Sequence, residues 1–451
     1  MSVTDLRSHI SQLIQERQIH TVRVVLHDPS NIQRARYVPV RYFLEQVIQG
    51  SLSYPSALFS MDTSASLVPD AGDGFAGGYP SWVMKPDLAT FGIIPSSPGM
   101  AHVIADIYLP NGQPVPTAPR HVLRRVLADI SEAGYRVYGA FEYEFYVFRT
   151  DGSHTGMQGL EPIWNGLQCF SEVKQAEVED IITSVMFALT DMGAGPEVAN
   201  TEYGSGQFEV TNSPFWGLEI ADMAFYYRTL IREVLQHKGY KVSFMAKPVT
   251  NMSGSGAHTH HSLFDHKGNN LFSDPEQPDG LSQLCRWFIG GQIQHARALS
   301  ALCNPTVNSY KRLKPYSFAP TTVTWGYEHR GAIIRIPQHR GENTRLENRL
   351  PGADTNPYIT LAAMLAAGMD GIRRQIKPPP PLLNQDAYAS DFLGLPRSLP
   401  QALAALEEDT FFWETLGQDY LRHFISMRRK EWERYEAAVT DWEYKEYFDL
   451  Y

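Results

Sequence analysis

Residues 140–146 read Ala140-Phe-Glu-Tyr-Glu-Phe-Tyr146, an alternation of aromatic and acidic residues with a period of two. Successive side chains of a β-strand point to opposite faces of a sheet. Glu142 and Glu144 therefore share one face, and the aromatic residues fill the other. The pattern predicts a strand over residues 136–148 with an aromatic core face and an acidic face.

The same spacing recurs in three later segments of the chain. A single Glu-x-Glu or His-x-His pair is usually a solvated face, but four such sets, flanked by glycine or aromatic residues, favour another interpretation. Strands that turn these groups to one side build a polar lumen, and burying so many like charges is prohibitive unless a cation neutralises them. The later sets are Gln207 and Glu209, with Glu202 just upstream; His258 and His260; and Arg345, Glu347 and Arg349.

The residue types in these sets indicate which ligands the lumen binds. Glutamates with a histidine suit hard divalent ions such as Mg²⁺ or Mn²⁺, which prefer oxygen ligands and tolerate imidazole. Interspersed arginines suit phosphate and carboxylate oxygens through bidentate contacts. The sequence therefore predicts a site that binds divalent metals together with anions.

Composition excludes several classes of partner. The chain has 451 residues, 43% hydrophobic and 20% charged, with a formal net charge of −10. That length predicts two domains or one large elaborated domain, and the negative charge argues against a nucleic-acid or anionic-membrane partner. The three widely spaced cysteines argue against a disulfide framework and favour a reducing cytoplasm. Neither a signal peptide nor a bilayer-spanning segment is expected.

A proline-containing segment near 110–119 predicts a linker, so we expect one domain over residues 1–112 and a second over 113–451. Residues 62–87 are rich in Gly, Pro, Ser and Asp and predict a long functional loop. The first domain should further contain helices at 4–18 and 42–48 and strands at 21–26, 35–40 and 101–107. The second should contain helices at 121–133, 173–191, 216–237, 279–299 and 356–373, and a helical tail over 399–451 whose aromatic residues pack against the body or a neighbouring subunit.

Several motifs in one order resemble the glutamine synthetases and their relatives, most strongly over residues 140–373. Each string alone is a moderate signal, and together they form a strong one. They are Pro86-Asp87-x-x-Thr90, Lys247-Pro, Gly254-Ser-Gly-Ala-His-Thr-His-His-Ser262, Asn308-Ser-Tyr-Lys-Arg-Leu, Arg335-Ile-Pro, Arg345-Leu-Glu-Asn-Arg and Asn356-Pro-Tyr.

This resemblance implies an α+β fold with a small N-terminal β-grasp domain and a large catalytic domain. The catalytic domain would hold an antiparallel, barrel-like sheet with flanking helices. The resemblance also implies ATP and two to three Mg²⁺ or Mn²⁺ ions per active site, and a homo-oligomer, a dodecamer of two stacked hexamer rings. The substrate activated would be L-glutamate, through a γ-glutamyl phosphate.

Individual residues take roles only by their match to the family's motifs. Glu144, Glu202 and Glu209 match the ligands of one metal, and Glu142, His258 and Glu347 match those of another. Arg330 and Arg335 match the pair that steadies the transferred phosphoryl group. Nucleotide contacts fall at Glu197, His260, Ser262 and Arg345, and substrate contacts fall at Arg312, Arg349, Ser253, Gly254 and Phe318.

One segment departs from the ammonia-using members. They have Pro-Gly-x-Glu-Ala-Pro, whose glutamate binds ammonium, whereas this chain reads Pro315-Tyr-Ser-Phe-Ala-Pro320 and places Phe318 at the glutamate position. A tyrosine that borders the ammonium pocket is replaced near Cys169-Phe170, and the asparagine before the Gly-Ser-Gly becomes Ser253. An apolar, aromatic pocket favours a neutral amine that carries carbon, or a cation held against a ring face. This predicts a glutamate–amine ligase similar to γ-glutamylputrescine and γ-glutamyl-alkylamide synthetases.

Other interpretations stay open at this point. An ammonia-using glutamine synthetase that tolerates Phe318 is the main alternative. A non-catalytic structural or sensing relative would have lost metal ligands, and a guanidino-kinase-like activity has no feature that calls for it. In relatives an aspartate on the first-domain loop helps to deprotonate the amine in a neighbouring subunit, and the candidates here are Asp62, Asp70 and Asp73.

Overall fold

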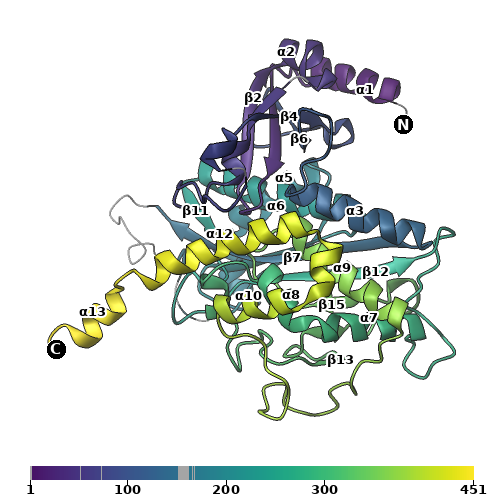
Figure 1. Ribbon diagram of the computed structural model, residues 1–451, viewed down its shortest axis with the longest axis vertical. Coiled ribbons are helices and arrows are strands. Elements are labelled where there is room, and N and C mark those ends of the chain that lie inside the picture. The colour runs from purple at the N-terminus through teal and green to yellow at the C-terminus, as the bar shows by residue number, and fades with distance from the viewer. Residues whose placement is uncertain (1–2, 51, 73, 151–161, 165, 167) are drawn as a thin grey trace.

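The computed structural model describes residues 3–50, 52–72, 74–150, 162–164, 166 and 168–451 (Figure 1). In this part of the chain the strands form two sheets, and the buried apolar side chains form one large cluster, one smaller cluster and two groups of three residues each. The smaller cluster lies within the N-terminal residues, between Ile10 and Ala118. None of the described helices is both long enough and apolar enough to span a bilayer.

The smaller sheet has the strand order β2-β1-β6-β4-β3, with β5 paired to β6. Its β1–β6 pairing is parallel and the others are antiparallel. The strands are β1 (Thr21–His27), β2 (Gln33–Pro39), β3 (Leu52–Pro55), β4 (Ser81–Pro86), β5 (Gly92–Ile93) and β6 (Met100–Tyr108), and the accompanying helices are α1 (Val3–Glu16) and α2 (Val40–Glu45). A connection follows β6, and the boundary after residue 112 stays a prediction.

The larger sheet positions the site. Its strand order is β13-β14-β15-β12-β7-β9-β8, with β10 and β11 also paired to β7, and all pairings except β13–β14 are antiparallel. The strands are β7 (Arg136–Arg149), β8 (Pro196–Thr201), β9 (Gln207–Asn212), β10 (Phe215–Trp216), β11 (Tyr240–Ser243), β12 (Ala257–Phe264), β13 (Trp325–Tyr327), β14 (Ile334–Ile336) and β15 (Leu346–Asn348). The aromatic face of β7 is buried in the large cluster, as the alternation at 140–146 predicts.

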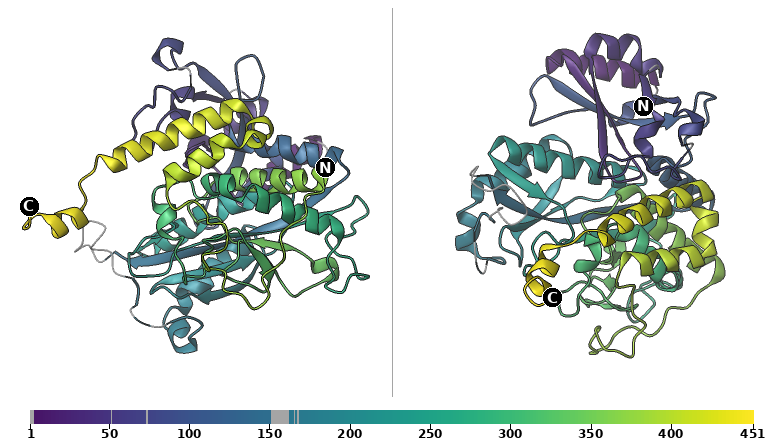
Figure 2. Two further views of the ribbon diagram at one scale, coloured as in Figure 1. Left: turned by 60° about the horizontal axis from the view of Figure 1, so that its bottom comes forward. Right: turned by 60° about the vertical axis from the view of Figure 1, so that its left-hand side comes forward.

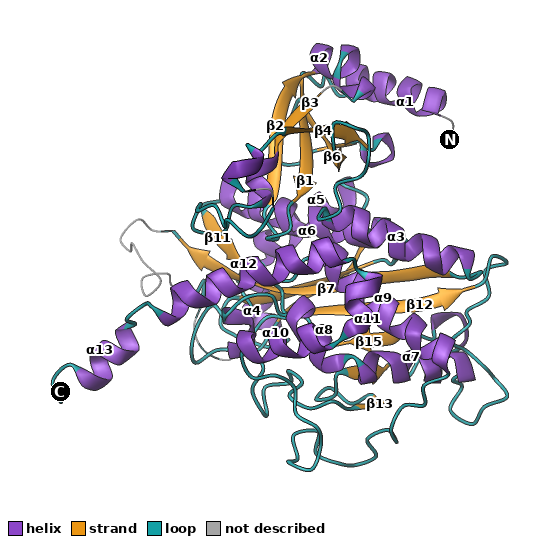
Figure 3. Cartoon of the chain, in the orientation of Figure 1, coloured by secondary structure: helices purple, strands orange, loops and turns teal. Residues whose placement is uncertain are grey.

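Several helices lie between this sheet and the smaller one, and others pack beside it (Figure 3). The helices of this part of the chain are α3 (Pro119–Glu132), α4 (Glu172–Ala176), α5 (Glu179–Asp191), α6 (Glu219–His237), α7 (Gln283–Gln294), α8 (Ala296–Cys303), α9 (Pro357–Arg374), α10 (Leu399–Glu408), α11 (Thr410–Thr415), α12 (Gln418–Glu436) and α13 (Asp441–Tyr447). The helix expected over 279–299 is split into α7 and α8 at His295. This imidazole hydrogen-bonds Asp409 at 2.6 Å and Asp370 at 3.0 Å, which ties the break to α9 and to the start of α11.

The expectation of a loop over residues 62–87 needs correction, since Ser81–Pro86 is β4 and pairs with both β3 and β6. The aromatic residues expected to pack along the tail over 399–451 divide into two groups. Trp432 contacts the large cluster, whereas Trp442 of α13 is 62% exposed and its helix extends away from the rest of the chain (Figure 2).

A network of buried charged side chains connects the N-terminal sheet with two helices of the second part of the chain. Arg120 of α3 contacts Asp106 of β6 at 2.8 Å, Asp87 after β4 at 2.8 Å and Asp222 of α6 at 2.7 Å. The Pro86-Asp87-x-x-Thr90 motif has its structural role here, because Asp87 also accepts from Ala89 N and Thr90 Oγ1 accepts from Ile104 N. Arg120 therefore links the N-terminal sheet to α3 and α6, the helices that lie between the two sheets.

Candidate active site

A cavity of about 480 Å³ opens on the polar face of the larger sheet. Fourteen of the seventeen residues predicted for the site line it: Glu142, Glu144, Glu202, Glu209, Ser253, Gly254, His258, His260, Arg312, Phe318, Arg330, Arg335, Arg345 and Arg349. Gln207, Phe170, Tyr203, Ser317 and Ala319 complete the lining.

Strand register explains why residues far apart in sequence meet. His258 of β12 is the register partner of Glu142 on β7, and His260 is the register partner of Glu347 on β15. On the other side of β7, Glu144 is the partner of Glu209 on β9. Directly opposed residues project from the same face of a sheet, so three antiparallel pairings gather the acidic and imidazole groups.

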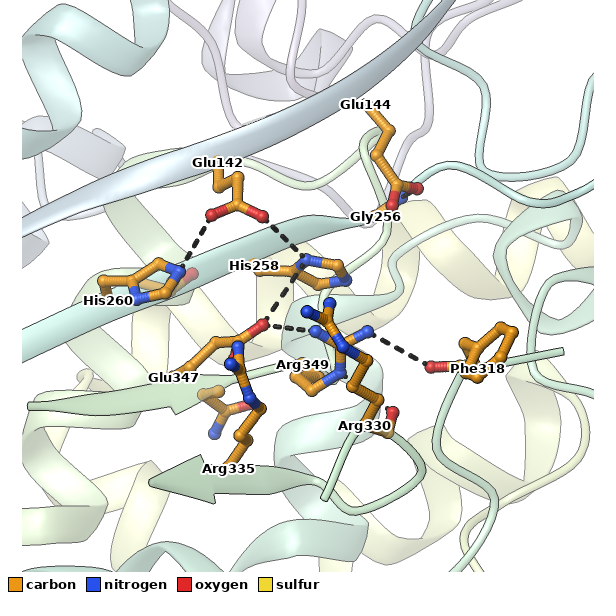
Figure 4. Close-up of polar contacts among 12 residues, drawn as sticks. Glu142, Glu144, Gly256, His258, His260, Phe318, Arg330, Arg335, Glu347 and Arg349 are labelled. Carbon is orange, nitrogen blue, oxygen red and sulfur yellow. Dashed lines mark hydrogen bonds and ion pairs between the residues drawn. The ribbon is translucent and has the colours of Figure 1, made fainter. Parts of the chain in front are cut away.

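Glu142 is the centre of this cluster (Figure 4). Its carboxylate lies 3.1 Å from His260 Nε2 and 3.6 Å from His258 Nδ1. The same His258 nitrogen lies 3.7 Å from Glu347, and it is buried without a hydrogen-bond partner. A buried ring nitrogen that faces two carboxylates beyond hydrogen-bonding distance is the arrangement expected of a cation ligand.

The described part of the chain contains two compact groups of side chains that could each coordinate a metal ion. Glu142, His260 and Glu347 form one, and Glu142, Glu209 and His258 form the other, with the donor atoms of each group within 4.8 Å of one another. These groups share residues with the two sets implied by resemblance but divide them differently. Glu144 instead accepts from Gly256 N at 2.7 Å, and Glu202 accepts from Asn200 at 2.8 Å.

The carboxylates titrate over a wide range because their neighbours differ. Burial and the charges of nearby glutamates raise the pKa of Glu209 well above its usual range, and burial with the charge of Glu144 raises that of Glu202 to about 7. Burial opposes ionisation of Glu347, yet Arg349 and the two imidazoles lower its pKa to about 2. A buried carboxylate whose pKa is raised by other carboxylates, as that of Glu209 is, would be stabilised in its ionised form by a bound cation.

The arginines form a second layer beside the carboxylates. Arg335 donates to Glu347 at 2.6 Å and to Glu328 at 2.8 Å. Arg349 also pairs with Glu347 and donates to the carbonyl of Arg330 at 3.0 Å. Arg312 donates only to carbonyl oxygens, and burial lowers its pKa to about 10. Its guanidinium has no carboxylate partner among the described residues, so it suits an anionic ligand.

The Gly-Ser-Gly segment before β12 is glycine-rich because the backbone passes close to this arginine. A Cβ atom at Gly254 would lie 2.6 Å from Arg312 Cγ and 2.8 Å from the carbonyl oxygen of Ala246. One at Gly256 would lie 2.7 Å from His258 Nε2. Glycine at both positions therefore allows the imidazole and the guanidinium to reach the cavity.

Three predicted residues do not line the cavity. Glu347 is buried behind His258 and the arginines. Ser262 donates to the carbonyl of Thr344, and Glu197 on β8 accepts from Ser213. The other two residues predicted to contact the nucleotide are adjacent, since Arg345 Nε lies 3.2 Å from His260 Nδ1.

The three candidate aspartates lie elsewhere. Asp62 is buried, accepts from Ser64 and Ser66 and lies 3.2 Å from Arg434 of α12. Asp70 is exposed and does not line the cavity, and Asp73 lies outside the described residues. The structure of this single chain therefore brings neither described aspartate to its own cavity.

Two residues of the site were missed in the sequence. Tyr203 follows Glu202 in a glycine-rich loop with no periodicity, and it lines the cavity. Gln168 is fully buried and donates to the carbonyls of Glu202 and Gln207 at 2.9 and 3.2 Å, while Gly206 N donates to its side-chain oxygen. The only signal in the sequence is the Glu202-to-Gln207 loop itself, whose two glycines predict a tight turn beside an acidic residue.

Comparisons with known proteins agree with this geometry. Residues 116–447 match the family model described as glutamine synthetase, catalytic domain. The chain is 32% identical to a glutamate–isopropylamine ligase from Pseudomonas sp. over 98% of its own length and 97% of the relative's. It is 33% identical to a glutamine synthetase from Thermotoga maritima over 98% and 99%. A solved structure titled "Apo GmaS without ligand" superposes with a TM-score of 0.86 at 30% identity, covering 98% of this chain and 99% of that one. The expected fold, with a small N-terminal domain and a large catalytic domain, is confirmed.

Proposed function

Since this chain belongs to the glutamine synthetase family and is an ATP-dependent ligase, we propose that it joins the γ-carboxylate of L-glutamate to a primary organic amine. The proposal rests on the position of Phe318. This residue lines the same cavity as the arginines and the carboxylates that could bind metal ions. Ammonia-using relatives resemble this segment but have a glutamate there. An aromatic ring cannot attract an ammonium ion as that carboxylate does, and it contacts hydrocarbon favourably.

The two half-reactions define what the residues must do. A carboxylate is a poor electrophile, so an oxygen of the γ-carboxylate attacks the γ-phosphorus of ATP, and the bond to the β-phosphate oxygen breaks to release ADP. The amine lone pair then attacks the carbonyl carbon, phosphate leaves with the electrons of the C–O bond, and the nitrogen loses a proton. Positioning and charge neutralisation dominate both steps.

Residues in and beside the cavity are assigned to these tasks as proposals, and two of them, Glu197 and Ser262, do not line it. Arg330 and Arg335 neutralise the transferred phosphoryl group, and Arg312 and Arg349 hold the carboxylates of glutamate. Ser253 and Gly254 line the same substrate region. Contacts to the nucleotide are assigned to Glu197, His260, Ser262 and Arg345.

The donor set fits divalent metal. The buried His258 nitrogen lacks a hydrogen-bond partner between two carboxylates, and the pKa of Glu209 is raised by burial among other acids. Mg²⁺ or Mn²⁺ bound there, two to three ions per site, would neutralise charge on phosphate and carboxylate oxygens. The proposed ligands are Glu142, Glu144, Glu202, Glu209, His258 and Glu347.

The test of the proposed function is amine selectivity. With saturating ATP and L-glutamate, kcat/KM for a small alkylamine should exceed that for ammonium by at least about tenfold, because each buried methylene contributes roughly 0.8 kcal/mol. Rates are measured as phosphate release and corrected for the unprotonated fraction of each amine. If ammonium is the best substrate, the enzyme is a glutamine synthetase and this proposal is wrong.

We also propose a dodecamer of two stacked hexamer rings, held partly by the C-terminal segment. Beyond α12 the chain exposes apolar side chains that a lone subunit would leave in water, and contiguous apolar surface of this kind is normally buried in an interface. These side chains are Val439, Trp442, Tyr444, Phe448 and Leu450. The free cysteines Cys169, Cys285 and Cys303 suit the cytoplasm as the proposed compartment.

Removing residues 439–451 should therefore reduce the assembly to single rings. Light scattering after size exclusion would give about half the native mass, because the truncation removes the exposed apolar segment and leaves the cavity residues in place. A matched control replaces the exposed Lys445 of α13 by alanine, which should leave the mass unchanged. A truncated protein with the native mass would contradict this role for the segment.

A further inference from the structure

Three aromatic side chains gather at the cavity, and they come from three separate segments. Phe170 precedes α4, Tyr203 follows β8 and Phe318 precedes β13. Their exposed fractions are 66%, 58% and 49%, so each ring faces solvent in the free chain. In Figure 4, Phe318 lies on the side of Arg349 away from His260. Large apolar side chains exposed together in a pocket are typical of a ligand-binding surface.

The backbone at two of these residues is strained. Phe170 has a φ of 53° and Phe318 a φ of 59°, in the left-handed region that glycine adopts without cost. A bulky residue is a genuine outlier there. Strain alone does not identify a functional residue, since Tyr316 has a φ of 61° without lining the cavity, but Phe170 and Phe318 combine it with a place on the cavity wall.

Hydrogen bonds to backbone groups fix the loops that carry the three rings. Phe170 N donates to the carbonyl of Thr201, and Thr201 Oγ1 donates to the carbonyl of Gln168. Gln168 in turn donates to the carbonyl of Glu202, beside Tyr203. The carbonyl of Phe318 accepts from Arg349 at 3.4 Å. The loops that carry the three rings are therefore held beside the carboxylate cluster.

Ring geometry distinguishes an apolar surface from a cation cage. The centroids of Tyr203 and Phe318 lie 5.5 Å apart with an interplanar angle of 35°, so the two rings contact each other. No ammonium group fits between rings at this separation. The carboxylates that line the cavity are Glu142, Glu144, Glu202 and Glu209, all of which are proposed metal ligands. Among the described lining residues, none is left to pair with a second ammonium group.

We infer that Phe170, Tyr203 and Phe318 form the subsite for the organic group of the amine, and that it takes primary monoamines with an apolar alkyl or aryl group. This inference rests on the proposed function. The hydrocarbon would contact the rings, whereas the second ammonium of a diamine would lose its water without gaining a partner. The subsite therefore selects against diamines of the same length.

The test compares n-butylamine with 1,3-diaminopropane, which have the same chain length and differ in whether the end group is methyl or ammonium. We expect the wild-type kcat/KM, corrected for unprotonated amine, to favour butylamine by at least about tenfold. Phe318→Ala and Tyr203→Ala should each reduce this ratio at least threefold, and Phe318→Leu should keep more of it than Phe318→Ala. Tyr316→Ala is the matched control, because Tyr316 shares the loop but does not line the cavity, and the ratio should stay within twofold of wild type.

Hydroxylamine separates the possible failures. It is small and needs no apolar subsite, so γ-glutamyl hydroxamate should form from glutamate and ATP in the wild type and in every correctly folded variant. Absence of hydroxamate with the wild type would refute the proposed function itself. Two results would overturn the subsite while leaving the proposed function intact, provided that hydroxamate forms. One is a wild-type ratio of kcat/KM for butylamine to that for 1,3-diaminopropane near one. The other is a ratio that neither Phe318→Ala nor Tyr203→Ala changes.

Discussion

Replacing Glu142 by alanine is expected to lower kcat/KM more than about 100-fold, which is the upper end of what the loss of an outer-shell partner costs a metal site. Glu142 is the one residue common to both compact donor groups among the described residues. Its removal leaves His260 without its hydrogen-bonded carboxylate and takes from His258 the nearer of its two carboxylate contacts. No other residue change should affect both groups at once.

Metal binding gives a readout that is independent of catalysis. Titration with Mn²⁺, followed by electron paramagnetic resonance, should show weaker binding and fewer bound ions in Glu142→Ala than in the wild type. Glu142→Gln keeps the side-chain volume and removes the charge, so it should behave similarly if ligation is the cause. Alanine at Glu132, an exposed glutamate of α3, is the control. Wild-type affinity for Mn²⁺ in Glu142→Ala would show that this carboxylate is not a ligand.

The composition of this cluster was predictable from sequence, but its internal arrangement was not. The period-two spacing of Glu142 and Glu144 requires only that the segment be a strand, and β7 confirms that it is one. The pairing of Glu142 with His258 depends on the register of β7 against β12, which lie more than a hundred residues apart. Register follows from the packing of whole strands, so the sequence named the donors without showing which of them share an ion.

Residues in irregular segments were harder to find for a related reason. Tyr203 and Gln168 lie outside regular strands, where no periodicity marks the face that a side chain occupies. Gln168 reaches its place through contacts with backbone carbonyls, and any residue can supply those. β4 was missed because its strand is short and its burial pattern does not alternate cleanly. Each of these features is fixed by tertiary contacts.

Replacing Arg120 by methionine is expected to have the largest effect on stability, a loss of about 3–5 kcal/mol in the free energy of unfolding. Arg120 is almost fully buried, and it contacts Asp87, Asp106 and Asp222. Methionine fills much of the same volume but leaves these carboxylates without their shared cation. Breaking a buried pair on one side costs more than the pair itself contributes, because the remaining charge keeps its desolvation penalty.

Arg124 provides the matched control, since it contacts Asp87 and Asp106 but has a side chain that is 41% exposed. Solvent screens such a pair, so Arg124→Met should cost no more than about 1 kcal/mol. Thermal and urea unfolding at equal subunit concentration would measure the free energy of unfolding of both variants.

The stabilising effect of Arg120 should also depend on pH. Although burial raises the pKa of Asp87, the two arginines lower it by more, so that the net pKa lies below its usual value. Its contribution to stability is therefore present above the unfolded pKa of about 3.9 and is lost as the pH falls through the lower folded value. The stability difference between wild type and Arg120→Met should thus be large at pH 7 and shrink below pH 4, because a protonated Asp87 no longer needs the guanidinium. Equal small losses in the two variants, or a difference independent of pH, would contradict the view that Arg120 is the charge that joins the N-terminal sheet to the catalytic helices.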